Sequence, residues 1–114
     1  MTQHAGLTEE RWAGFELGRQ LMMIANEMHR ASGAIESRRI DSARLAYERV
    51  LRLLDLTVRV QPRRTLRREL LRWRDLVAAL YVADEPDPVR HRAAFRIFLQ
   101  LNPETARQIP YVLG

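Results

Sequence analysis

The chain has 114 residues, of which 46% are hydrophobic and 29% charged, so it is long enough to bury a core as one domain. It contains no cysteine, which excludes a disulfide framework, a thiolate zinc site and a cysteine nucleophile and fits a reducing compartment. The formal net charge of +5 favours acidic partners such as nucleic acid or an acidic protein. No signal peptide and no apolar run of about 18 residues is apparent. We therefore expect one domain over residues 1–114, cytoplasmic and not associated with a membrane.

The N-terminal third of the chain predicts one long helix after a loose leader over residues 1–7. Thr8 can cap this helix through its hydroxyl, and Glu9 and Glu10 stand where the helix dipole favours acids. The main apolar stripe comprises Leu17, Leu21, Ile24, Met28, Ala31 and Ile35. A second stripe comprises Phe15, Gly18, Met22, Ala25 and His29. A helix that is apolar over most of its girth is buried on more than one side, and Ser32-Gly33 ends or loosens it.

Two further helices are predicted in the middle of the chain. Asp41 is the predicted N-cap of the second helix, although Ile40 fits its apolar stripe. Pro62 breaks this helix, and a third helix restarts at about Arg63 with the proline in its first turn. The stripe of the second helix comprises Ala43, Tyr47, Val50, Leu51, Leu54 and Val58. The core face of the third comprises Leu66, Leu70, Trp73, Val77 and Leu80.

Two caps followed by proline mark the C-terminal helices. Asp87 begins a fourth helix that runs to about Leu101, and Asn102 begins a short fifth helix that Pro110 stops. The fourth helix has Ala94, Ile97, Phe98 and Leu101 on one side and Phe95 and Leu99 on the other. No sustained alternation or hairpin-turn sequence predicts a strand. Because short connections make successive helices antiparallel, we expect an all-α, up-down-up-down four-helix bundle with a short C-terminal fifth helix.

Arginine supplies all 19 basic side chains of the chain. Seven of them lie between Arg59 and Arg74, where Glu69 is the one acidic residue. A guanidinium is planar and permanently charged, and it pairs at two points with carboxylate or phosphate. A GC-rich genome, which favours arginine codons, and a solvated charged face are the alternative explanations. The candidate anion-binding or nucleic-acid-binding face of the third helix consists of Arg63, Arg64, Arg67, Arg68 and Arg72.

Motifs for catalysis, metal binding or cofactor binding are not apparent. A di-iron bundle requires Glu-x-x-His pairs, but Asn26 stands at that spacing before His29 and Pro88 stands there before His91. We interpret the three histidines as surface or rim residues. The chain has no glycine-rich phosphate loop, no nucleophile elbow and no second copy of a 34-residue repeat. We therefore assign no catalytic residue, metal or cofactor and favour a non-enzymatic protein over an enzyme.

Part of the chain resembles a group of small, uncharacterised prokaryotic helical-bundle proteins. The segments that carry the resemblance are Ile24–Glu27, Arg30-Ala31, Ala46–Leu51 and Leu53–Thr57. The resemblance implies a helical bundle and no particular activity. It draws attention to Glu27, Arg30 and Asp55, polar residues that flank the core stripes. We interpret these three as a candidate polar network, either an ion-pair network that fixes helix register or a carboxylate–arginine site.

The predicted helices carry more apolar surface than a single bundle seam requires. Phe15 and Met22 of the first helix, with Phe95 and Leu99 of the fourth, form a candidate oligomer face. A closely packed monomer that buries these residues with the help of Tyr111, Val112 and Leu113 is the alternative. Twofold dimers are the commonest oligomers, so we favour a homodimer.

Three functions remain open from these observations. We expect a structural or interaction module that self-associates and docks an acidic partner. The alternative is a nucleic-acid-binding accessory protein that uses the arginine face of the third helix. The third is an enzyme with its site at the candidate polar network.

Overall fold

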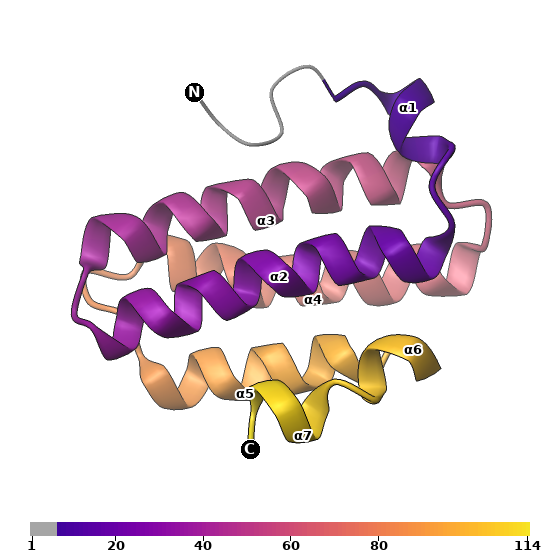
Figure 1. Ribbon diagram of the computed structural model, residues 1–114. Coiled ribbons are helices and arrows are strands. Elements are labelled where there is room, and N and C mark those ends of the chain that lie inside the picture. Colours follow the sequence, from indigo (N-terminus) through magenta and orange to yellow (C-terminus); the bar gives the residue numbers. More distant parts are fainter. Residues whose placement is uncertain (1–6) are drawn as a thin grey trace.

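The computed structural model describes residues 7–114, and these residues contain helices and no strand, which confirms the all-α class (Figure 1). The predicted leader lies, apart from Leu7, outside the described residues. No helix in this part of the chain has both the length and the apolar character needed to cross a bilayer. The helices are α1 (Glu9–Ala13), α2 (Leu17–Glu36), α3 (Ile40–Val60), α4 (Arg64–Val82), α5 (Pro88–Leu99), α6 (Pro103–Ala106) and α7 (Ile109–Val112).

The predicted first helix is two helices, α1 and α2, so the prediction of one continuous helix is wrong. Thr8 caps α1 as predicted, since its Oγ1 accepts a 3.2 Å hydrogen bond from the backbone amide of Arg11. The chain then becomes extended at Glu16. The break lets Trp12 reach α3, where its Nε1 donates a 2.9 Å hydrogen bond to Thr57 Oγ1. Burial of this ring therefore outweighs the continuous helix that the apolar spacing predicts.

Gln20 stabilises the break between α1 and α2. The end of a helix leaves backbone carbonyls without partners inside the helix. The Gln20 Nε2 donates to two of the carbonyls in this segment, those of Trp12 at 2.8 Å and Phe15 at 3.1 Å. Because Gln20 is itself buried, its side-chain amide also needs hydrogen-bond partners, and these two bonds supply them.

The helix α2 continues through Ser32 and Gly33 to Glu36, so of the two predicted effects of these residues, ending the helix or loosening it, the first is wrong. Glycine costs about 1 kcal/mol in a helix interior. Here Ala31 and Ala34, on either side, are buried against the neighbouring helices, and their packing offsets that cost.

A residue in the left-handed region separates α2 from α3. Arg38 has a φ of 57° and reverses the chain. The helix α3 then begins at Ile40 with Arg39 at the N-cap position, rather than at the predicted cap Asp41. Asp41 lies instead in the first turn, where the helix dipole favours a carboxylate.

The predicted core face of the third helix is confirmed in α4, which buries Leu66, Leu70, Trp73, Val77 and Leu80. The helix begins at Arg64, with Pro62 in the non-helical segment before it.

Both predicted caps of the C-terminal helices are present. Asp87 Oδ1 accepts 3.0 and 3.1 Å hydrogen bonds from the first amides of α5, and Asn102 Oδ1 accepts a 2.9 Å bond from the Glu104 amide of α6. The helix α5 ends at Leu99, two residues before the predicted end. Pro110 lies in the first turn of α7, where its missing amide has no consequence, so the prediction that it stops the last helix is wrong.

The four long helices lie side by side around one core (Figure 1). The contacts between α2 and α3 are the most extensive, and α3 with α4, α2 with α5, and α4 with α5 complete the set. The helix α1 packs on α3, and α6 packs on α2. One continuous apolar core includes side chains from Trp12 to Leu113. The packing between α4 and α5 is the least extensive of the four, which positions the groove described below.

Candidate functional site

The predicted arginine face lies on the outer side of α4 and is exposed. Arg63, Arg64 and Arg68 are exposed, and Arg67 is partly buried. Arg72 Nη1 lies 3.9 Å from Glu69 Oε1, whereas the other four make no ion pair within residues 7–114. We call these five residues the arginine strip. Several uncompensated guanidinium groups on one helix attract an anionic partner and can pair with its carboxylates or phosphates at two points.

No exposed aromatic ring accompanies the arginine strip on α4. Trp73 is buried, and its Nε1 donates a 2.8 Å hydrogen bond to the Ala94 carbonyl. Its ring packs on Phe98 with the ring centres 4.3 Å apart. Leu71, which is 48% exposed, is the large apolar side chain between the arginines. The strip therefore offers charge without a stacking platform for bases.

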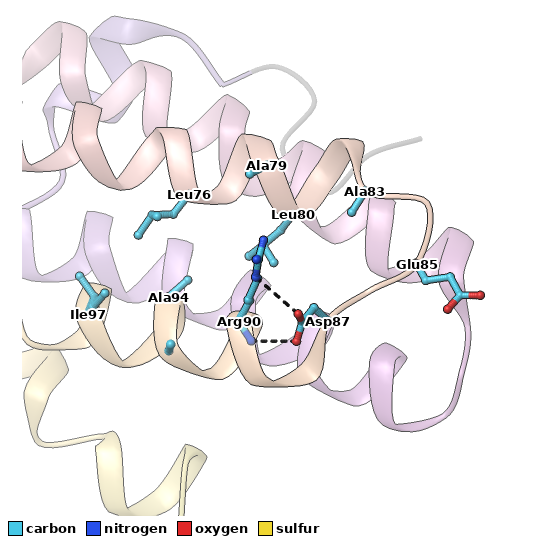
Figure 2. A pocket seen from close by; sticks show the side chains of 10 residues that line it. Leu76, Ala79, Leu80, Ala83, Glu85, Asp87, Arg90, Ala94 and Ile97 are labelled. Carbon is cyan, nitrogen blue, oxygen red and sulfur yellow. Dashed lines mark hydrogen bonds and ion pairs between the residues drawn. The ribbon is translucent and has the colours of Figure 1, made fainter.

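A groove between α4 and α5, the α4–α5 groove, was not predicted from the sequence. It has a volume of about 440 Å³, and Figure 2 shows the side chains that line it. Its walls are apolar along most of their length, and its polar residues gather at the loop between the helices, where Arg90 pairs with Asp87 at 3.6 Å (Figure 2). The lining residues are Leu76, Ala79, Leu80, Ala83, Glu85, Asp87, Arg90, Ala93, Ala94 and Ile97.

The groove was missed because the sequence pattern assigned Ile97 to a buried side of its helix. Ile97 is 46% exposed, while Phe95, Phe98 and Leu99 bury the other sides of α5. A helix with three buried large side chains on two faces leaves its remaining apolar position for solvent. Leu76 could have indicated the groove from the sequence, because it is a large apolar residue outside the predicted core face of the third helix.

The predicted oligomer face is not a shared exposed surface, and this prediction is wrong. Phe95 and Leu99 are fully buried in the core of the molecule. Phe15 packs edge-on against the Trp12 ring with centres 5.8 Å apart, and Met22 is partly buried. A second chain cannot reach Phe95 or Leu99 without unfolding this one.

The C-terminal segment packs on the first turn of α2, at Gly18 of the second stripe. The Glu104 carboxylate of α6 lies against Gly18, close enough that a side chain there would meet it. Leu113 is buried, and the Arg92 guanidinium donates a hydrogen bond to its carbonyl. The small size of Gly18 thus admits α6 rather than a second subunit.

The predicted polar network is divided between two places. Glu27 is 1% exposed, and its carboxylate accepts bonds from Arg30 at 2.8 Å and from Arg49 of α3 at 2.5 Å. Asp55 instead pairs with Arg74 of α4 at 2.7 Å, and this bond raises the pKa of the Arg74 guanidinium. Glu27 therefore links α2 to α3, and Asp55 links α3 to α4. This geometry favours a role in helix register for both pairs.

His91 is buried, so its interpretation as a surface or rim residue is wrong. Tyr47 Oη lies 2.8 Å from His91 Nδ1, and Ser32 Oγ lies 2.8 Å from Nε2. Ser32 donates its hydrogen to the Met28 carbonyl at 3.2 Å, so Nε2 must carry a hydrogen and donate to Ser32. Burial lowers the pKa of His91 to about 4, which leaves the ring neutral. Burial also raises the pKa of Tyr47, consistent with its role as the donor to Nδ1.

The chain of hydrogen bonds from Tyr47 to Met28 connects α3, α5 and α2. A serine beside a histidine resembles a nucleophile and its base, but here the hydroxyl hydrogen points to a backbone carbonyl. With its low pKa, His91 is a weak base. The ring also packs against the rings of Tyr47 and Phe95. We interpret this network as a structural link. His29 is exposed, and His4 lies outside the described residues.

Among residues 7–114, no three side chains of the types that bind metals lie together in a way that could hold an ion. A comparison of the chain with protein families, curated proteins and solved structures found no match. Two surfaces are therefore the candidates for function: the arginine strip and the α4–α5 groove.

Proposed function

We propose that this protein is a non-enzymatic interaction module that self-associates and binds an acidic protein segment through the arginine strip of α4. We further propose that its four long helices form an up-down-up-down bundle that holds the strip rigid. The observation that carries the proposal is the exposed strip itself, in which four of five arginines have no acidic partner within residues 7–114. Rigid placement lowers the entropy that binding costs.

An acidic protein segment fits the strip better than nucleic acid does. Sequence-independent nucleic-acid binding needs only arginines near phosphates, and the strip meets that requirement. Single-strand binding also uses exposed aromatic rings, and Trp73 is buried. The exposed Leu71 adds an apolar contact of the kind that a peptide side chain can use.

The test is a binding titration with two fluorescent probes, a glutamate-rich peptide and an oligonucleotide of equal charge. In the triple variant Arg64→Gln, Arg68→Gln, Arg72→Gln, we expect the peptide to bind about tenfold more weakly, because each exposed charge pair contributes about 0.2–1 kcal/mol. The matched control removes three exposed arginines elsewhere: Arg11→Gln, Arg96→Gln, Arg107→Gln.

The control variant should stay within about twofold of the wild type, since net charge alone contributes little at physiological salt. Equal weakening in both triple variants would show that only net charge matters and would contradict the proposal. Tighter binding of the oligonucleotide than of the peptide would favour the nucleic-acid alternative.

A further inference from the structure

The α4–α5 groove and the loop end beside it expose several large apolar side chains. Leu76 and Ile97, which line it, are 43% and 46% exposed. Val82 and Val89, near the loop end, are 73% and 78% exposed. Exposed apolar side chains that line one groove offer a surface for a partner. The shape and charge of the groove restrict which partner fits it.

The two large exposed apolar side chains of the groove lie at one end of it (Figure 2). Leu76 and Ile97 lie at the end away from the loop, whereas Ala79 and Ala83 lie toward the middle and the loop, and Leu80 between them is buried. A partner of the same shape, turned end for end, places its bulky residues over the small ones. Small residues also let two helices approach closely.

The row of α4 residues that enters the groove changes charge along its length. Arg68, Arg72, Leu76, Ala79 and Ala83 follow each other at helical spacing; Arg68 and Arg72 precede the groove, and Glu85 follows in the loop. This row is thus basic before the groove, apolar along it and acidic at the loop. Arg72 stands seven positions before Ala79, and Glu85 stands six positions after it.

We propose that the α4–α5 groove binds a second copy of this chain, face to face, with a twofold axis that crosses the groove near Ala79. This arrangement brings Glu85 of each copy opposite Arg72 of the other, and Leu76 of each copy over the small residues of the other. A twofold axis along the groove would place like charges together, so the pattern selects the antiparallel arrangement.

The inference rests on the proposed function, because it identifies the acidic segment that the arginine strip binds. That segment is the loop between α4 and α5 of the second copy, which carries Asp84, Glu85 and Asp87. Arg90 offsets one of these charges through its pair with Asp87. An acidic segment from another protein competes with the second copy for the same strip.

The first test is the mass of the full-length protein, measured by analytical ultracentrifugation from micromolar to submillimolar concentration. We expect a reversible dimer. Ile97→Glu should weaken it about tenfold or more, because the carboxylate is buried only in the dimer. Leu45→Glu is the matched control, since Leu45 is a 51% exposed leucine on α3, outside the groove, and its variant should dimerise normally. Circular dichroism checks that both variants keep their helices.

The second test addresses the antiparallel arrangement through charge exchange. Arg72→Glu faces Glu85 of the other copy, and Glu85→Arg faces Arg72, so each single variant should weaken the dimer several-fold. The double variant restores opposite charges across the interface and should recover most of the loss. Failure of the double variant to recover would overturn the arrangement.

A third test uses the absence of cysteine from the chain. Ala79→Cys introduces one exposed thiol beside the proposed axis, and a short bismaleimide should join two copies. Leu45→Cys should not be joined.

The outcomes separate this inference from the proposed function. A wild-type protein that stays monomeric, yet binds the acidic peptide through the strip, would overturn the inference and the self-association in the proposed function, while leaving the binding of an acidic segment in place. A dimer that resists Ile97→Glu and is not cross-linked through Ala79→Cys would overturn the groove as its interface while leaving self-association in place. A dimer that behaves as predicted but binds no acidic peptide would support the inference. It would contradict the part of the proposed function in which the strip binds an acidic segment of another protein.

Discussion

The hydrogen bonds of His91 indicate the tautomer of the neutral ring. Nε2 donates to Ser32, whose own hydrogen goes to the Met28 carbonyl, and Nδ1 then accepts from Tyr47. Burial disfavours the charged ring and lowers the pKa of His91 to about 4, from an ordinary value of 6.5.

This shift makes the stability of the protein depend on pH. Between pH 6.5 and pH 4 the unfolded chain binds a proton at His91 that the folded chain does not bind, so the stabilisation is fully present above about pH 6.5 and is lost as the pH falls. We expect the free energy of unfolding in urea to decrease by about 2 kcal/mol between pH 7 and pH 5.

Two glutamine variants identify the group that titrates. His91→Gln should be less stable at pH 7 but should lose most of this pH dependence. His29→Gln is the control, because His29 is exposed, and it should keep the slope of the wild type. An unchanged slope in His91→Gln would contradict the assignment.

At the scale of the element, α4 has three distinct sides. One side packs in the core through Leu70, a second carries the arginine strip, and a third lines the α4–α5 groove and is in line with Arg68 and Arg72 of the strip. Each side follows from residues spaced three or four apart, as an α-helix requires. The same helix therefore contributes to the core and carries residues of both candidate surfaces.

The sides of α4 predict opposite effects for two alanine substitutions. Leu70→Ala should lower the free energy of unfolding by about 2–5 kcal/mol, because it removes a fully buried side chain and leaves a cavity. Arg64→Ala should change it by no more than about 0.5 kcal/mol, since Arg64 is exposed and makes no ion pair within residues 7–114. Denaturant melts of both variants measure these changes. Equal losses in the free energy of unfolding would contradict the assignment of Leu70 to the buried side of α4 and of Arg64 to an exposed side.

The helices were predictable where local spacing decides the structure. The caps Thr8, Asp87 and Asn102 and the core face of α4 follow from residues within one or two turns. The break between α1 and α2 was not predictable in this way, because it depends on the contact of Trp12 with Thr57, 45 positions away.

The candidate site was predictable only in part for the same reason. The exposure of the arginine strip follows from the helical pattern of α4. The division of the polar network could not be predicted, because Glu27 and Asp55 find their partners on other helices, Arg49 and Arg74. The burial of Phe95 likewise depends on its packing in a core built from helices far apart in the chain.

At the scale of the whole molecule, polar links hold the helices around the core in a fixed register. Glu27 joins α2 to α3, Asp55 joins α3 to α4, and the bonds of His91 join α5 to both α2 and α3. Buried ion pairs add little net stability, but they can specify one arrangement of helices over others. This frame presents α4, with its strip and its groove, as the surface for partners.

The central claim is that α4 is the binding element of the molecule, and the most direct measurement is a two-dimensional ¹⁵N–¹H NMR titration with the glutamate-rich peptide. We expect the amide signals that move with added peptide to belong to the first half of α4, from Arg63 to Arg72, while those around Glu27 and His91 stay in place. Shifts centred on Glu27 or His91, or an absence of shifts along α4, would contradict the account.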